Sequence, residues 1–192
     1  MTLVRLSTPA ETPISVAEVK AQMRVDHDDD DTLIGTLIDA AVDMVDGTGK
    51  LGRAMVTQSW GQWANQAPGW VPLRMGPVQG LTAVEYYDAD GVLQAATLTD
   101  YEIFRDGELY LAKPKSGAAW PAAQVRPDAI LISWTAGFGD AATDVPAGLR
   151  AALKLIVAHW YEHREAVAAD GLSELPMGAD MLIGLHRVGW YG

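Results

Sequence analysis

His159, Glu162 and His163 are the residues whose types and spacing best support chemistry. They match the H-x-x-E-H pattern of inverted zinc peptidases. On a helix, two histidines four residues apart lie on one face and could share a metal ion, with Glu162 as the general base. This pattern makes a small zinc hydrolase the alternative function of the chain.

A zinc site of this kind also needs a third protein ligand. The downstream glutamates are Glu165, on the same predicted helix, and Glu174, in a loop, and both are poorly placed for that role. We therefore favour the interpretation that the two histidines flank Trp160 and Tyr161, a pair that is buried or faces a partner. No metal ligand is assigned.

Other candidate motifs are incomplete. An EF-hand loop that starts at Asp26 requires Gly at its sixth position and Glu at its twelfth, but these positions hold Asp31 and Leu37. Gly137 and Gly139 lack the third Gly, the Lys and the Ser/Thr of a phosphate loop and indicate a strand-to-helix turn. The four histidines are scattered, so no Ser–His–Asp set can be argued. We expect no catalytic residue, no enzymatic activity and no cofactor.

Charge is the main constraint from composition. The 192 residues carry a formal net charge of −11, and the acidic residues are concentrated before residue 49. Such a surface repels phosphate, which disfavours tight DNA binding but allows DNA to pass alongside. The chain has no cysteine and no apolar run of about 20 residues, so we expect neither disulfides nor a membrane span.

Three helices are predicted. Ser15 and Glu18 form a capping box for a short helix that ends near Val25. The carboxylates of residues 26–31 favour the start of a second helix, which runs to the C-cap glycines Gly47 and Gly49. Asp144 is the expected N-cap of a third, long helix, with Pro146 in its first turn.

Alternation of apolar and polar residues predicts five to seven short strands between these helices, in residues 55–139. Turn residues such as Asp88 to Gly91 separate them. The expected fold class is therefore α+β: a helical core of residues 1–54 and 140–192, including the C-terminal tail, and an inserted small antiparallel β module of residues 55–139.

Seven tryptophans are many for a chain of this length, and ordinary core packing explains most of those in the β module. A carbohydrate- or peptide-binding β module is a third possible function that this content suggests. Trp190 and Tyr191 lie within three residues of the last residue, where packing inside their own domain is disfavoured. We expect these two side chains to contact a partner, because Trp and Tyr are enriched at interfaces.

The order of these motifs resembles the head–tail connector (adaptor) proteins of tailed phages and related gene transfer agents. In those families the chain often closes with a Leu-Leu-x-Pro-Tyr-Arg-like signature, of which residues 182–187 keep only Arg187 in its place. The resembling segments are Ile14–Lys20, Met23–Leu33, Leu37–Ala41, Leu73–Val78, Val84–Gly91, Trp134–Gly139, Val145–Pro146, Leu155–Glu165 and Leu175–Gly178.

The resemblance implies a structural subunit of a phage or phage-like particle, located at the head–tail junction. Such subunits form a homo-oligomeric ring, commonly of about twelve copies, bound beneath the portal protein. The ring continues the DNA channel, through which DNA passes without tight binding, and offers a platform to a stopper or tail-terminator protein.

The resemblance also implies that the C-terminal segment docks on the portal. The residues expected there are Leu185, His186, Arg187, Val188, Trp190 and Tyr191. Aromatic and arginine side chains can contribute much binding energy when a partner desolvates them. His159, Tyr161 and Arg164 are a second set, expected on an intersubunit surface.

Overall fold

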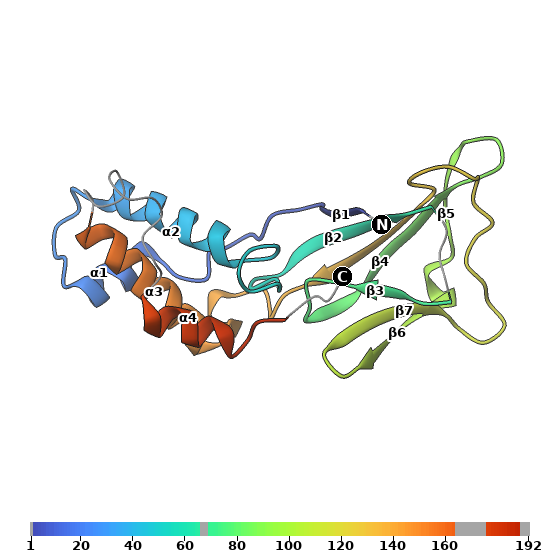
Figure 1. Cartoon of the computed structure of the whole chain (residues 1–192). Coiled ribbons are helices and arrows are strands. Elements are labelled where there is room, and N and C mark those ends of the chain that lie inside the picture. Colours follow the sequence, from blue (N-terminus) through green and yellow to red (C-terminus); the bar gives the residue numbers. More distant parts are fainter. Residues whose placement is uncertain (1, 66–68, 164–175, 189–192) are drawn as a thin grey trace. The chain divides into compact units, whose positions relative to one another are not determined.

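The computed structural model describes residues 2–65, 69–163 and 176–188 and has the predicted α+β class (Figure 1). The chain divides into two compact units. Residues 1–10 and 57–137 form the β unit, and residues 11–56 and 138–192 form the helical unit. The first ten residues were expected with the helices, but they cluster with the sheet because a first strand pairs there.

Two antiparallel sheets make up the β unit (Figure 1). The five-stranded sheet has the order β1-β2-β8-β4-β5, and the three-stranded sheet has the order β3-β7-β6. The strands are β1 (Thr2–Arg5), β2 (Gln58–Ala64), β3 (Val71–Leu73), β4 (Val78–Tyr87), β5 (Leu93–Ala95), β6 (Tyr101–Asp106), β7 (Leu109–Pro114) and β8 (Ile130–Ala136).

Tryptophan packing stabilises the β unit. Trp134 on β8 is fully buried, and its indole N–H donates a 3.0 Å hydrogen bond to the carbonyl oxygen of Arg74, just after β3. Trp60 on β2 lies directly opposite Trp134 and is also buried, whereas Trp70 is half exposed. Core packing therefore accounts for Trp60 and Trp134, as the sequence indicated.

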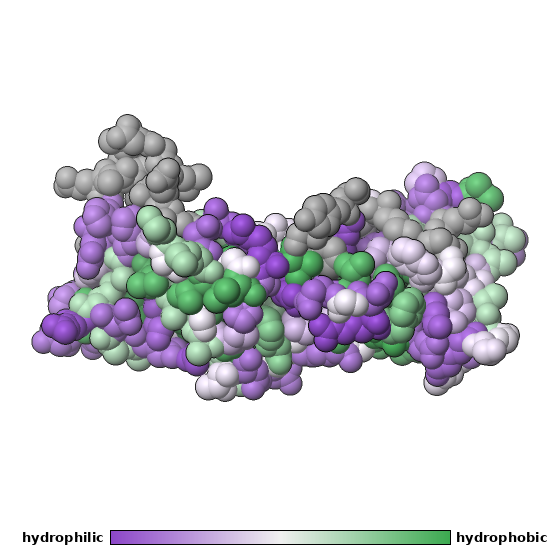
Figure 2. All heavy atoms as spheres, turned by 60° about the horizontal axis from the view of Figure 1, so that its bottom comes forward, coloured by the Kyte–Doolittle hydropathy of each residue, from purple (hydrophilic) through white to green (hydrophobic). Residues whose placement is uncertain are grey.

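Four helices build the helical unit in the described part of the chain: α1 (Val16–Met23), α2 (Asp31–Val45), α3 (Ala147–Glu162) and α4 (Met177–Gly184). Each contributes apolar side chains to one core, including Val19, Ile34, Leu153 and Ile183. Hydrophobic residues also gather at the surface of this unit over α4, outside the core (Figure 2).

The helix ends differ from the prediction in two places. The capping box of Ser15 and Glu18 is present. Asp30 precedes α2, but its side chain does not cap that helix and instead accepts a hydrogen bond from the Tyr161 hydroxyl. Asp144 does not cap α3; its carboxylate accepts a 3.0 Å hydrogen bond from the backbone N–H of Ala141, which begins a preceding 3-10 turn. In both places the carboxylate accepts a hydrogen bond from a donor outside the helix that it was expected to cap.

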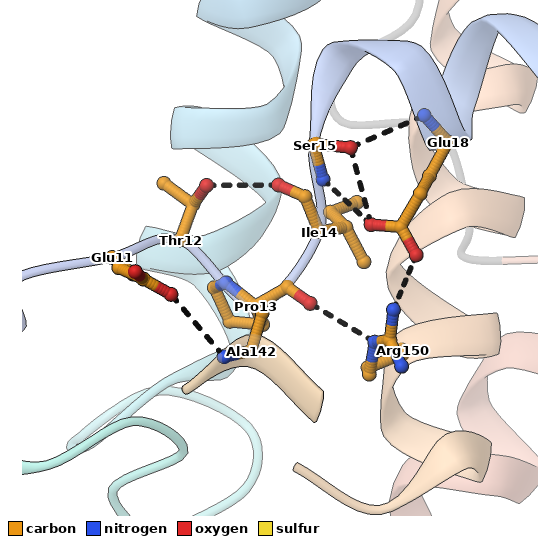
Figure 3. A network of polar contacts seen from close by, with 8 residues as sticks. All are labelled: Glu11, Thr12, Pro13, Ile14, Ser15, Glu18, Ala142 and Arg150. Carbon is orange, nitrogen blue, oxygen red and sulfur yellow. Dashed lines mark hydrogen bonds and ion pairs between the residues drawn. The ribbon is translucent and has the colours of Figure 1, made fainter. Parts of the chain in front are cut away.

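A polar network joins the segment before α1 to α3 (Figure 3). The Arg150 guanidinium forms an ion pair with Glu18 and donates a 3.2 Å hydrogen bond to the carbonyl oxygen of Pro13. The backbone N–H of Ser15 donates to the same Glu18 carboxylate at 2.9 Å, and that hydrogen bond, with the nearby Arg150 charge, lowers the pKa of Glu18. One arginine on α3 thus holds both the start of α1 and the chain that leads into it.

We predict that Arg150→Met lowers the free energy of unfolding by about 1–2 kcal/mol at pH 7, because it leaves Glu18 and Pro13 without this donor. The Glu18 pKa is lowered by folding, so the ion-pair part of the loss is present above the ordinary Glu pKa and disappears as the pH falls through the lowered value. Urea denaturation at pH 7 and pH 3 measures both effects.

Arg105→Met is the matched control, because Arg105 makes an exposed ion pair with Glu108 on the β unit. We expect that change to alter stability by less than about 0.5 kcal/mol. Equal effects of the two substitutions at pH 7 would contradict the role given to Arg150.

Candidate interaction surface

Close packing against α3 positions α4. Ala179 and Ile183 form the inner face of α4 and are fully buried. Gly148 on α3 lies at this contact: a Cβ atom at this position would lie 3.7 Å from the side chain of Leu182 and 3.8 Å from the ring of His186, which are ordinary van der Waals distances. A side chain longer than alanine at position 148 would therefore push α4 and the segment after it outward.

The outer face of α4 carries three large apolar side chains that solvent reaches. Met177 is 81% exposed, Met181 is 69% exposed and Leu185, just after the helix, is 79% exposed. Their spacing of four residues places them in one row, which we call the α4 stripe. Figure 2 shows hydrophobic residues gathered on this face. Burying each such side chain against a partner would contribute about 1.5–3 kcal/mol, so the stripe has the chemistry of a contact surface.

The residues after α4 turn back onto the helical unit. The Arg187 guanidinium donates a 2.9 Å hydrogen bond to the carbonyl oxygen of Lys50 and lies 3.3 Å from Asp180. The backbone N–H of Val188 donates a 3.1 Å hydrogen bond to the carbonyl oxygen of Leu51. These bonds anchor the chain up to residue 188 on the loop that follows α2.

The residues expected at the portal therefore differ in their surroundings. Leu185 is exposed, whereas the His186 ring packs edge-on against Phe138, with centroids 6.4 Å apart. Arg187 and Val188 form the hydrogen bonds described above. Trp190 and Tyr191 lie outside the described residues.

The second set of predicted contacts lies at the end of α3. The Tyr161 hydroxyl binds Asp30 of the same chain, and Arg164 lies outside the described residues. The rings of His159 and His163 are close, with centroids 4.4 Å apart, and Nδ1 of His163 is 2.9 Å from the carbonyl oxygen of His159. The structure thus brings the two histidines together on one helix face, as their spacing predicts.

A third ligand for these histidines is not found in the described part of the chain, where no three His, Asp or Glu side chains are grouped closely enough to hold a metal ion. Glu162 is exposed at the last position of α3, and the predicted alternatives Glu165 and Glu174 lie outside the described residues. Within the described residues the site therefore offers only the imidazoles of His159 and His163, and Nδ1 of His163 already contacts a backbone carbonyl oxygen.

A groove runs along α1 on the same unit. It has a volume of about 550 Å³ and is lined by Val16, Ala17, Lys20, Ala21, Val25, Asp28 and Asp31. The Lys20 ammonium lies 2.5 Å from Asp28 and 2.7 Å from Asp31. These hydrogen bonds raise the pKa of Lys20, and the bond to Lys20 lowers the pKa of Asp28. We call this feature the α1 groove: its lining combines valine and alanine side chains with the charged groups of Lys20, Asp28 and Asp31, which we call its rim.

Neither surface was predicted from the sequence. Met177, Met181 and Leu185 do have helical spacing, but the buried Ala179 and Ile183 between them make the segment apolar on both sides. Periodicity alone does not separate an inner from an outer face in that case.

None of the helices in the described residues is both long and apolar enough to cross a membrane.

Comparison with known proteins gives matches by family and by fold. Residues 13–95 match the family model "Phage gp6-like head-tail connector protein". The whole chain matches three solved structures over 100% of its length and 97% of theirs. They are the neck of an empty GTA particle computed with C6 symmetry (24% identity, TM-score 0.79), the virion of a native gene transfer agent particle (24%, 0.78) and the neck of a native GTA particle computed with C12 symmetry (23%, 0.75). No curated protein matches the chain significantly.

We predict that the purified protein holds less than stoichiometric zinc after incubation with the ion and desalting, and no more than the double variant His159→Ala/His163→Ala. The physical reason is that two imidazoles without a third ligand bind zinc too weakly to survive dilution. Elemental analysis by mass spectrometry measures the content. One zinc ion per chain, lost in the double variant, would instead support the hydrolase interpretation.

Proposed function

We propose, from the match of residues 13–95 to the phage gp6-like head–tail connector family model, that the protein is a structural subunit of a head–tail junction. It forms a ring beneath the portal protein, extends the DNA channel and provides the platform on which a stopper or tail-terminator protein attaches. It makes and breaks no covalent bond. Its place is in a phage or gene transfer agent particle.

The observation that carries this proposal is the likeness in fold to neck structures over the entire chain. The match covers nearly all of both chains, so it includes the β unit, α4 and the segment beyond the family model. The exposed α4 stripe also agrees with a role at a head–tail junction. A subunit that works by contact needs apolar surface that is free before assembly.

Symmetry supports the ring. The similar particles were computed with C6 and C12 symmetry, and homo-oligomers usually close as symmetric rings. The acidic character supports the channel, because a surface with net negative charge lets DNA pass without holding its phosphates. The ring and the DNA channel are therefore both part of the function that we propose for this chain.

Contact with the portal is assigned to the C-terminal tail, residues 186–192. The hydrogen bonds of Arg187 and Val188 fix the position from which Trp190 and Tyr191 follow. Leu185, just before this tail, is exposed but belongs to the α4 stripe. An anchored base lowers the ordering cost of binding, and two terminal aromatics supply contact area.

We predict that the double variant Trp190→Ala/Tyr191→Ala keeps its thermal stability but lowers the fraction of tailed particles at least about tenfold, because truncated aromatic anchors at interfaces typically cost 2 kcal/mol or more. Electron microscopy counts the tails, and quantitative mass spectrometry measures the amount of the protein in purified heads.

Removal of Gly192 alone is the matched control, since it alters the terminus but leaves both aromatics in place. We expect it to behave as the unaltered protein. Heads that retain the double variant at normal occupancy and carry normal tails would refute the assignment of the tail to this contact.

A further inference from the structure

We propose that the α4 stripe of one copy docks into the α1 groove of the neighbouring copy, and that this contact closes the ring. The inference rests on the proposed function for the existence of a ring. It adds which surfaces meet and names a second copy of this chain as the occupant of both.

The geometry of rings supplies the first argument. A ring with more than two copies cannot use one patch against itself, because each subunit must present one surface to the next copy and a different one to the previous copy. The helical unit carries two different surfaces of this kind, a row of exposed apolar side chains and a groove. The row is the α4 stripe of Met177, Met181 and Leu185, and the groove is the α1 groove.

The two surfaces belong to different helices, so two neighbours can occupy them at once. The inner face of α4, with Ala179 and Ile183, is buried in the core, and the stripe lies on its outer face. On α1, Val19 is buried in the same core while the groove is lined by Val16, Ala17 and Ala21. Occupation of either surface therefore requires no change in the packing of the core.

The shapes and side-chain types of the two surfaces fit one another. Two of the three residues of the stripe are methionines, whose unbranched side chains adapt to irregular apolar surfaces. The apolar lining of the groove consists of alanine and valine side chains, which leave room for longer ones. A row spaced by four residues matches a groove that follows a helix, as in packing of ridges into grooves.

The charges around the two surfaces are opposite. Lys50 and Arg187 are exposed beside the end of α4, with Asp180 as the neighbouring anion, which gives a net positive charge. The rim of the groove carries Asp28 and Asp31 around a single Lys20, which gives a net negative charge. When the exposed sequence neighbours Arg24, Asp26 and Asp29 are included, the net charge of the rim stays negative. Complementary charge fixes the register in which two apolar surfaces meet.

This pairing also gives a role to the acidic run of residues 26–31. The run does not cap α2 through Asp30 and does not form a calcium loop. As the rim of the groove, it would attract the basic end of α4 of a neighbouring copy. Like charges would repel a second acidic rim, so the same run disfavours groove-to-groove contact.

Disulfide trapping tests the pairing, because the chain has no cysteine of its own. Two full-length versions with different tags are expressed together in the particle-producing cell, one with Met181→Cys on the stripe and one with Ala21→Cys in the groove. Purified particles are oxidised and separated on a non-reducing gel. A disulfide requires Cβ atoms about 3.5–4.5 Å apart, so Leu185→Cys and Ala17→Cys are made as a second pair of positions.

We expect the mixed stripe–groove dimer to form at least about tenfold more than either stripe–stripe or groove–groove dimers. Val125→Cys is the control, because Val125 is fully exposed on the β unit and lies on neither surface. That version paired with Ala21→Cys should give no dimer above background.

The other outcomes separate the two proposals. If the protein is absent from the particles, the proposed function itself fails. If the protein is present but neither pair of positions gives the mixed dimer, the function stands and the pairing is wrong. If Met181→Asp frees the protein from heads while groove variants assemble normally, the stripe binds a different protein, and the pairing is equally overturned.

Discussion

The close approach of α4 to α3 is the constraint on which the rest of the helical unit depends. Leu182 and His186 lie close to Gly148 on α3, and Ala179 and Ile183 complete the core. With its inner face buried, α4 holds its outer apolar row toward solvent. The same packing leads the chain to Lys50 and Leu51, whose carbonyl oxygens accept hydrogen bonds from the Arg187 side chain and the Val188 N–H. The burial of one face of α4 thus positions both the α4 stripe and the segment that follows the helix.

Segments distant in sequence are joined by a small number of polar contacts. Arg150 connects α3 to Pro13 and Glu18, and Tyr161 connects the end of α3 to Asp30 before α2. The chain passes between the two units after residues 10, 56 and 137, so the helical unit is assembled from two separate stretches. These contacts add to the buried apolar cluster that both stretches share, which makes the interrupted helical unit one core.

Local signals were predicted from the sequence more reliably than tertiary ones. The capping box at Ser15 and Glu18 needs only neighbouring residues, and it is present. The acidic run of residues 26–31 was expected to start α2, and α2 does begin at Asp31, but the Asp30 side chain binds Tyr161 and does not cap the helix. Asp144 was expected to cap α3, but its carboxylate binds within a 3-10 turn. The four-residue strand β1 gives too short a pattern to detect, and α4 is apolar on both faces, so its periodicity conceals which side is buried. The portal contact, the ring and the division into a helical core with an inserted β module stay predictions.

The central claim is that this protein works through surfaces that mate with further copies of itself at a head–tail junction. Cryo-electron microscopy of the particles that contain it tests this most directly. The claim predicts a symmetric ring below the head, into which the chain fits with Met177, Met181 and Leu185 buried against the adjacent copy. Particles whose junction lacks the chain, or a ring in which those three side chains face solvent, would contradict it.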